Sequence, residues 1–239
     1  MGSQNEYTGQ LTSKNKLPNL FMIFIKCGGV DVDDLLFKEN LKRYYNQEAD
    51  LRNSSEKQNW KINVRKNFYT LIKQENKETL LELGAGSGYD SQFFMKNGLK
   101  VIATDLSSEM IKKCKEKNIE AYELDFYNLS DINKKFDCIW AMNTLLHVPK
   151  TDLPKILNEI NLVLKENGLF YMGVYGGEDF ENEYVKAEVS DVPRFFSYYS
   201  RNNLKSTLDN CFKIIEFEEF NVGRGTEKDI FQSIIMINR

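Results

Sequence analysis

Short apolar runs alternate with amphipathic segments along most of the chain from residue 79 onward. Runs rich in Leu, Val and Ile predict buried strands, and segments with apolar residues recurring at helical spacing predict helices. The expected strands are 79–83, 100–104, 119–124, 136–141 and 169–174. The expected helices between them are 89–97, 107–117 and 152–165. This alternation predicts a parallel sheet with right-handed crossover connections.

The carboxyl-terminal part of the chain follows a different pattern. A helix is expected at 200–210, followed by two long strands at 212–220 and 229–238. Consecutive strands joined by a short loop that contains Gly223 and Gly225 usually pair with each other. We therefore expect an antiparallel hairpin at one edge of the sheet.

Two helices are predicted ahead of the first strand, at 33–46 and 55–73. The segment before them, 1–32, contains one apolar run, which is too short to cross a bilayer. We interpret 1–32 as an arm of uncertain order, with three alternatives open. It is an ordered arm, a packing strand or a segment added when the protein was produced.

The sequence Glu-Leu-Gly-Ala-Gly-Ser-Gly at 82–88 joins the first predicted strand to a helix. Its glycines permit left-handed backbone and a close approach of a ligand to a helix N-terminus. A dinucleotide fingerprint places its third glycine where this chain has Tyr89. Glu82 would also repel a pyrophosphate. The loop therefore favours a ligand without phosphates, and S-adenosylmethionine, with its sulfonium, ammonium and ribose, fits.

Three further features follow at regular spacing. Asp105 ends the second predicted strand, about twenty residues after Gly84, where an acid accepts hydrogen bonds from a ribose. Asp125 ends the third predicted strand and precedes Phe126. The fourth predicted strand turns into a loop that reads Met-Asn-Thr-Leu-Leu-His-Val-Pro at 142–149.

Together these motifs resemble class I S-adenosylmethionine-dependent methyltransferases, in particular the small, single-domain bacterial-type enzymes of broad or unassigned substrate. The resemblance implies a Rossmann-like α/β fold, with a mostly parallel seven-stranded sheet, helices on both faces and an antiparallel C-terminal hairpin. It implies one domain over 33–239, divided into a helical cap (33–76), a cofactor-binding core (77–174) and an acceptor-side insert (175–199). The implied reaction transfers the methyl group of S-adenosylmethionine to a small-molecule acceptor by in-line displacement, releasing S-adenosylhomocysteine.

The resemblance also implies roles for individual residues. Asp105 would receive the ribose, Asp125 the adenine amino group, and a cap residue such as Arg65 the methionine carboxylate. The full set of expected cofactor-binding residues is Glu82, Gly84, Ala85, Gly86, Gly88, Asp105, Leu106, Met110, Asp125, Phe126, Met142, Asn143, Arg65 and Tyr44.

The catalytic candidates are His147 and Tyr198. Methyl transfer from a sulfonium needs a general base only when the acceptor must lose a proton. His147, the only histidine of the chain, is either such a base or a loop residue that packs and hydrogen-bonds the backbone. Tyr198 follows Arg194 in a run that would line the acceptor pocket, with core packing as the alternative for its aromatic neighbours.

Composition narrows the class of partner. The net charge of −3 disfavours a nucleic-acid substrate, and the lysines between 112 and 117 alternate with glutamates as in a solvated helix face. Four scattered cysteines and one histidine predict no metal site and a cytoplasmic location. We expect no nucleic acid or membrane partner, and a monomer or homodimer. An RNA or protein methyltransferase and a non-catalytic S-adenosylmethionine-binding module stay open as alternatives.

Overall fold

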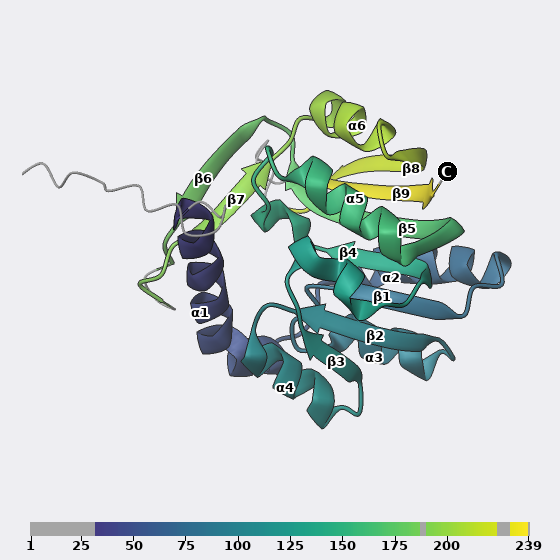
Figure 1. The fold of residues 1–239 in the computed structure, drawn as a ribbon, viewed down its shortest axis with the longest axis horizontal. Coiled ribbons are helices and arrows are strands. Elements are labelled where there is room, and N and C mark those ends of the chain that lie inside the picture. The colour runs from purple at the N-terminus through teal and green to yellow at the C-terminus, as the bar shows by residue number, and fades with distance from the viewer. Residues whose placement is uncertain (1–31, 187–189, 224–229, 239) are drawn as a thin grey trace, which may run out of the picture.

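A computed structural model describes residues 32–186, 190–223 and 230–238 (Figure 1). The expected arm at 1–32 thus lies outside the described residues, apart from Val32. Its main sheet has seven strands in the order β3-β2-β1-β4-β5-β9-β8. Their bounds are β1 Thr79–Leu83, β2 Lys100–Asp105, β3 Glu120–Glu123, β4 Phe136–Met142, β5 Leu164–Gly176, β8 Phe212–Asn221 and β9 Ile230–Asn238.

The pairing of these strands confirms the expected fold class. Strands β1 to β5 run parallel, whereas β9 is antiparallel to both β5 and β8. The strand order reverses between β1 and β4, because β2 and β3 extend one way and β5 the other. Ligands of open α/β sheets bind outside the carboxyl ends of the strands at such a point.

Helices cover both faces of the sheet. Their bounds are α1 Val32–Ser54, α2 Asn59–Gln74, α3 Tyr89–Lys96, α4 Ser108–Glu116, α5 Leu153–Val163 and α6 Arg201–Asp209, with 3₁₀ turns η1 Phe126–Ile132 and η2 Leu145–His147. Buried residues of α2 and α3, such as Phe68 and Phe94, pack with Val101 of β2. Those of α5 and α6 pack with Ile102, which points to the opposite face.

The first helix differs most from its prediction. The apolar spacing predicted an end at residue 46, but α1 continues to Ser54. Figure 1 shows α1, in purple, crossing the edge of the sheet at which the parallel strands end. The additional turns of α1 therefore lie over the expected binding edge. Among the described helices, none is long and apolar enough to span a membrane.

The segment 175–199 contains a second, two-stranded sheet that the sequence analysis did not predict. Strands β6 (Phe180–Tyr184) and β7 (Arg194–Tyr198) pair antiparallel, and the rings of Phe180 and Tyr198 stack 4.3 Å apart. The Ser197 hydroxyl donates to the Val148 carbonyl over 2.6 Å, which ties β7 to the loop after β4.

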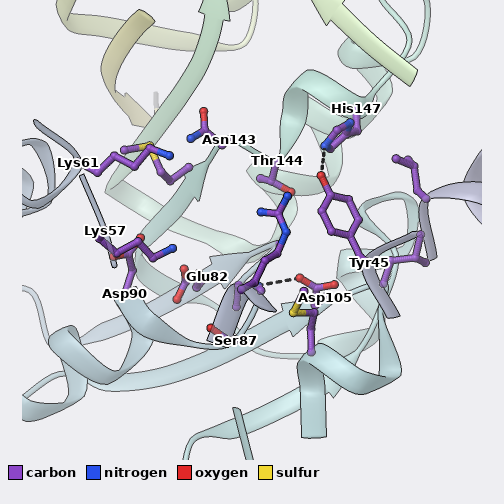
Figure 2. A pocket seen from close by; sticks show the side chains of 18 of the residues that line it. Tyr45, Lys57, Lys61, Glu82, Ser87, Asp90, Asp105, Asn143, Thr144 and His147 are labelled. Carbon is purple, nitrogen blue, oxygen red and sulfur yellow. Dashed lines mark hydrogen bonds between the residues drawn. The ribbon is translucent and has the colours of Figure 1, made fainter. Parts of the chain in front are cut away.

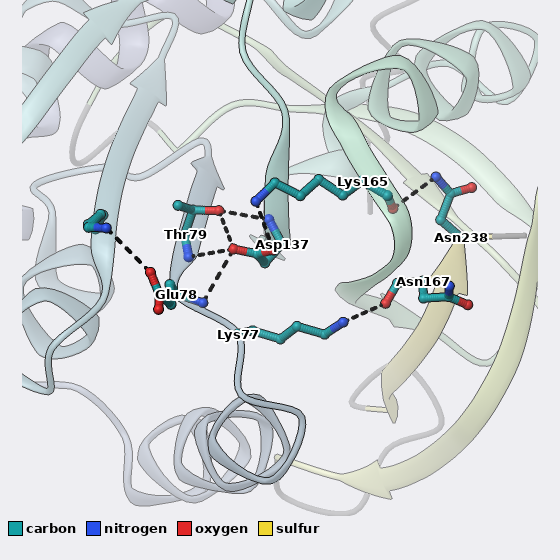
Figure 3. Close-up of polar contacts among 8 residues, drawn as sticks. Lys77, Glu78, Thr79, Asp137, Lys165, Asn167 and Asn238 are labelled. Carbon is teal, nitrogen blue, oxygen red and sulfur yellow. Dashed lines mark hydrogen bonds and ion pairs between the residues drawn. The ribbon is translucent and has the colours of Figure 1, made fainter.

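A polar network joins the strands at the amino-terminal ends of β1 and β4, on the side of the sheet away from α1 (Figure 3). The Asp137 carboxylate, at the start of β4, accepts from the Thr79 backbone N–H over 2.9 Å and from Lys165 over 2.9 Å. Lys77 donates to the Asn167 carbonyl over 2.9 Å. The amino-terminal ends of β1 and β4 are thereby joined to β5, far from the carboxyl ends of the strands.

Candidate functional site

A cavity of about 440 Å³ lies at the carboxyl ends of β1, β2 and β4, beneath α1 and the start of α2. Its volume falls within the usual range of small-molecule sites, roughly 300–1,000 Å³. Most of the sequence-predicted site residues line it: Glu82, Gly84, Ala85, Gly86, Asp105, Leu106, Met110, Asp125, Phe126, Met142, Asn143 and His147.

The glycine loop after β1 forms the floor of the cavity. Gly84 has φ +61°, and a Cβ there would lie 1.9 Å from the Thr144 hydroxyl oxygen. Gly88, with φ +78°, is the residue that precedes α3. Gly88 is absent from the cavity lining, so it serves the turn into the helix while Gly84 and Gly86 face the ligand space.

Asp105 stands at the end of β2 and is 8% exposed. Its carboxylate accepts from the backbone N–H of Gly86 over 2.8 Å and of Ser107 over 2.9 Å. Burial raises the pKa of Asp105, and these hydrogen bonds counteract the increase. The carboxylate thus holds the glycine loop and keeps lone pairs for a ligand hydroxyl.

Two carboxylates form an acidic end of the cavity. Glu82 is 3% exposed and accepts from the Ser91 hydroxyl. Asp90, two residues after the glycine loop, was not predicted from the sequence. It accepts from Arg65 over 2.7 Å and from the Trp140 indole N–H over 3.3 Å. Burial, followed by the negative charge of Asp90, raises the pKa of Glu82. A cationic ligand group would relieve this repulsion.

Three cations from the cap line the same cavity: Arg52, Lys57 and Lys61. Burial, with the charges of Lys57 and Arg52, lowers the pKa of Lys61 to about 8. Figure 2 shows Lys57 beside Asp90, and Lys61 on the side of Asn143. These residues were not predicted from the sequence, because charged side chains on and between amphipathic helices usually face solvent.

Asp125 and Phe126 border the cavity on the side of β3. The Asp125 carboxylate forms an ion pair of 2.8 Å with Lys38 of α1. The Lys38 ammonium also lies 3.4 Å from the centre of the Tyr127 ring. A ligand at Asp125 is therefore adjacent to α1 as well as to the sheet.

Tyr45 and His147 form the wall opposite the acidic end (Figure 2). The Tyr45 hydroxyl and His147 Nε2 are 2.6 Å apart, and His147 Nδ1 lies 2.7 Å from the Phe195 carbonyl oxygen. His147 is 6% exposed, and burial lowers its pKa to about 3. Tyr45 is a further lining residue that the sequence analysis did not select.

Besides Gly88, three predicted site residues do not reach the cavity lining. Arg65 is occupied with Asp90 and packs on Phe93. The fully buried Tyr44 donates to Glu48 over 2.7 Å, so its neighbour Tyr45 takes the position beside the cavity. Tyr198 stacks on Phe180 within the β6–β7 sheet. The described residues also contain no group of three or more His, Cys, Asp or Glu arranged to hold a metal ion.

The methyltransferase domain family matches residues 80–168. The match runs from β1 into β5 and includes the glycine loop, Asp105 and Asp125. This segment of the chain is a methyltransferase domain of the class I S-adenosylmethionine-dependent type. The cofactor of enzymes of this type is S-adenosylmethionine, which is therefore the expected ligand of the cavity.

Individual relatives of this chain are distant. The chain is 35% identical over 95 residues to the malonyl-(acyl-carrier protein) O-methyltransferase of Hamiltonella defensa subsp. Acyrthosiphon pisum (strain 5AT), covering 39% of this chain and 36% of that protein. It is 31% identical over 101 residues to the mitochondrial arginine-hydroxylase NDUFAF5 of Mus musculus, covering 41% and 29%. The chain thus spans about a third of the length of these curated relatives.

A solved structure shares the fold over most of the chain. The 1,6-didemethyltoxoflavin-N1-methyltransferase of Burkholderia thailandensis, with bound 1,6-didemethyltoxoflavin and S-adenosylhomocysteine, has a TM-score of 0.65 at 17% identity. The likeness covers 86% of this chain and 88% of that one. At this identity it shows the common fold.

Proposed function

We propose that the chain transfers the methyl group of S-adenosylmethionine to a small-molecule acceptor. One observation carries the proposal. Glu82, Asp105 and Asp125 come from the ends of three different strands, and all line one cavity with the glycine loop. Each offers a hydrogen-bond acceptor, which suits the ammonium, ribose and adenine amino groups of this cofactor.

The acidic end of the cavity, with the lysines beside it, suits the zwitterionic methionine end of the cofactor. Glu82 and Asp90 would receive the ammonium group. Lys57 and Lys61 lie within reach of the same end and would receive the carboxylate, in place of Arg65 and Tyr44. Paired opposite charges of this kind bind a zwitterion more strongly than a neutral ligand.

The other groups of the cofactor would lie along the strand ends. Asp105 would accept from the ribose hydroxyls and Asp125 from the adenine amino group, with Phe126 beside the ring. Leu106 and Met110 add apolar surface to the same wall.

When bound, S-adenosylmethionine supplies a methyl group on a sulfonium, an excellent leaving group. The task of the protein is then to hold the acceptor in line and to exclude water. We place the acceptor above Asn143 and His147, beneath α1 and near Phe195 of β7. The cover provided by α1 and the acidic net charge support a small acceptor rather than a nucleic acid.

Titration calorimetry with S-adenosylmethionine and S-adenosylhomocysteine tests the proposal. We expect both to bind in the micromolar range, and we expect no binding of NAD(H). Because one relative is named as a hydroxylase, transfer of labelled methyl groups to a metabolite extract is measured in parallel. Binding of NAD(H) with neither cofactor form bound would overturn the proposal.

The first prediction concerns Asp105. Asp105→Ala removes the acceptor for the ribose and for the Gly86 N–H, so we expect cofactor binding to weaken by roughly 1.5–3 kcal/mol. Asp131→Ala, at an exposed aspartate outside the cavity, is the matched control and should bind normally. An unchanged dissociation constant in Asp105→Ala, with an unchanged circular dichroism spectrum, would show that the ribose is held elsewhere.

A further inference from the structure

The hydrogen bonds around His147 determine where the protons lie. The Phe195 carbonyl can only accept, so His147 Nδ1 carries the proton of the bond between them. A neutral imidazole with Nδ1 protonated has a lone pair on Nε2, so the Tyr45 hydroxyl donates to it over 2.6 Å. The hydroxyl hydrogen of Tyr45 therefore points to His147 and is not available to a ligand.

The surroundings of His147 disfavour its protonated form. The ring is buried between Tyr45 and Phe196, whose ring centre lies 4.7 Å away. Burial is the main cause of the lowered pKa, and the guanidinium groups of Arg194 from β7 and Arg52 from α1 lower it further. His147 therefore stays neutral and has no capacity to take up a proton from an acceptor near pH 7.

Tyr45 is then a hydrogen-bond acceptor toward the cavity. Its phenol oxygen keeps lone pairs beyond the proton that it donates to His147. Burial raises the pKa of Tyr45 against the effect of Arg52 and Arg194, and the carboxylate of Asp105 raises it too. The phenol thus stays protonated, and this wall of the cavity offers a lone pair and no base.

Resting on the proposed methyl transfer, we propose that the acceptor is a nitrogen nucleophile, a primary or secondary amine. Its N–H donates to the Tyr45 oxygen, and His147 is the positioning residue that fixes the direction of the Tyr45 hydroxyl. A hydroxyl acceptor would need a base that this wall lacks. A carboxylate acceptor would bring its lone pairs against those of Tyr45.

The reaction balances without a protein base. The nitrogen lone pair forms the new C–N bond while the C–S bond breaks and its electron pair stays on sulfur. The product nitrogen carries the positive charge and then loses a proton to solvent. Because the N–H becomes more acidic as this charge develops, its hydrogen bond to Tyr45 strengthens in the transition state.

Nuclear magnetic resonance of the imidazole tests the proton assignment directly. His147 is the only histidine, so the chain labelled with ¹⁵N-histidine, with any affinity tag removed, gives a single imidazole. We expect a protonated Nδ1 and an unprotonated Nε2, with no titration from about pH 5 to about pH 9. A protonated Nε2, or a titration within this range, would overturn the role given to His147.

Substitutions separate positioning from proton transfer. His147→Gln keeps an oxygen that accepts from Tyr45, whereas His147→Leu does not. We expect His147→Gln to retain about tenfold or more turnover relative to His147→Leu, with the affinity for S-adenosylhomocysteine unchanged. Equal loss in the two variants would overturn the positioning role of His147. Tyr45→Phe should lower kcat, with the exposed Tyr122→Phe as the matched control.

Aniline, phenol and benzoate, which share one ring, test the acceptor class. Formation of S-adenosylhomocysteine should be at least about tenfold faster with aniline than with either other compound. A rate with aniline that is equal or lower, including no transfer at all, would overturn the nitrogen assignment. Calorimetry in the same samples separates the two proposals: failure to bind S-adenosylhomocysteine refutes the proposed function, whereas binding without the aniline preference refutes this inference alone.

Discussion

At the scale of single residues, Glu82 couples cofactor binding to pH. Burial and Asp90 raise its pKa in the unliganded protein, and a ligand ammonium beside it would lower that pKa. Binding must then release a proton, so we expect the affinity for S-adenosylhomocysteine to rise between about pH 6 and about pH 8. Calorimetry in buffers of different ionisation enthalpy measures the released proton.

The matched variant for this prediction is Glu82→Gln, which keeps the size of the side chain and removes its titration. Its affinity should be lower and nearly independent of pH over the same range. A wild-type affinity that falls with rising pH would contradict the placement of the ammonium at Glu82.

Sequence motifs located residues whose spacing reflects a fixed backbone, such as Gly84, Asp105 and Asp125. They did not separate Tyr44 from Tyr45, because adjacent helical residues differ in direction by about 100° and only the packing of α1 decides which one faces the cavity. The basic residues of the cavity were missed for a similar reason. Their charge predicts solvent exposure, and only the tertiary fold turns Lys61 inward.

At the scale of elements, α1 is attached to β3 and α4 by a row of polar contacts. Lys42 pairs with Glu123 over 2.5 Å, and Asp50 pairs with Lys113 of α4 over 2.7 Å. Asn46, between them, accepts from the Ser107 hydroxyl. These residues recur every four positions, so they share one face of α1. The lysines around 113, interpreted from sequence as a solvated helix face, therefore also hold the cover of the cavity.

Because exposed ion pairs weaken in salt, this attachment predicts salt-dependent release of the cofactor. Raising NaCl from about 0.05 M to about 0.5 M should increase the dissociation rate of S-adenosylhomocysteine, followed by tryptophan fluorescence in stopped flow. Lys42→Met should release it faster at low salt and show a smaller salt effect. Lys100→Met breaks an ion pair with Glu78 away from α1 and serves as the control. A rate independent of salt would show that α1 does not open during release.

The elements themselves were largely predictable, because buried strands and amphipathic helices carry their own periodicity. The exceptions have physical causes. Residues 47–54 lack apolar spacing, since that part of α1 contacts α4 and the cavity through polar groups. Strands β6 and β7 are short and lie in a Glu-rich segment, and pairing with each other, rather than a strong local preference, defines them.

At the scale of the whole molecule, the carboxyl ends of the parallel strands form the binding site, and their amino ends are joined by a stabilising polar network. The cavity occupies the carboxyl edge, whereas Asp137 and its partners join β1, β4 and β5 at the amino edge (Figure 3). The Thr79 and Lys165 hydrogen bonds lower the pKa of Asp137 to about 2, against the opposing effect of its burial. This division predicts that stability and binding can be changed separately.

Asp137→Ala should lower the free energy of unfolding by roughly 1–3 kcal/mol at neutral pH, because the Thr79 N–H and Lys165 lose their acceptor. The folded pKa is depressed, so this stabilisation is complete above the unfolded value of about 4 and is lost as pH falls toward about 2. Urea denaturation at pH 7 and near pH 3 should therefore show a smaller difference between variant and wild type at the lower pH. The affinity of Asp137→Ala for S-adenosylhomocysteine should equal that of the wild type. If the variant lost binding in proportion to stability, the Asp137 network and the cavity would form one cooperative unit. The network could then not be treated as a separate support for the site.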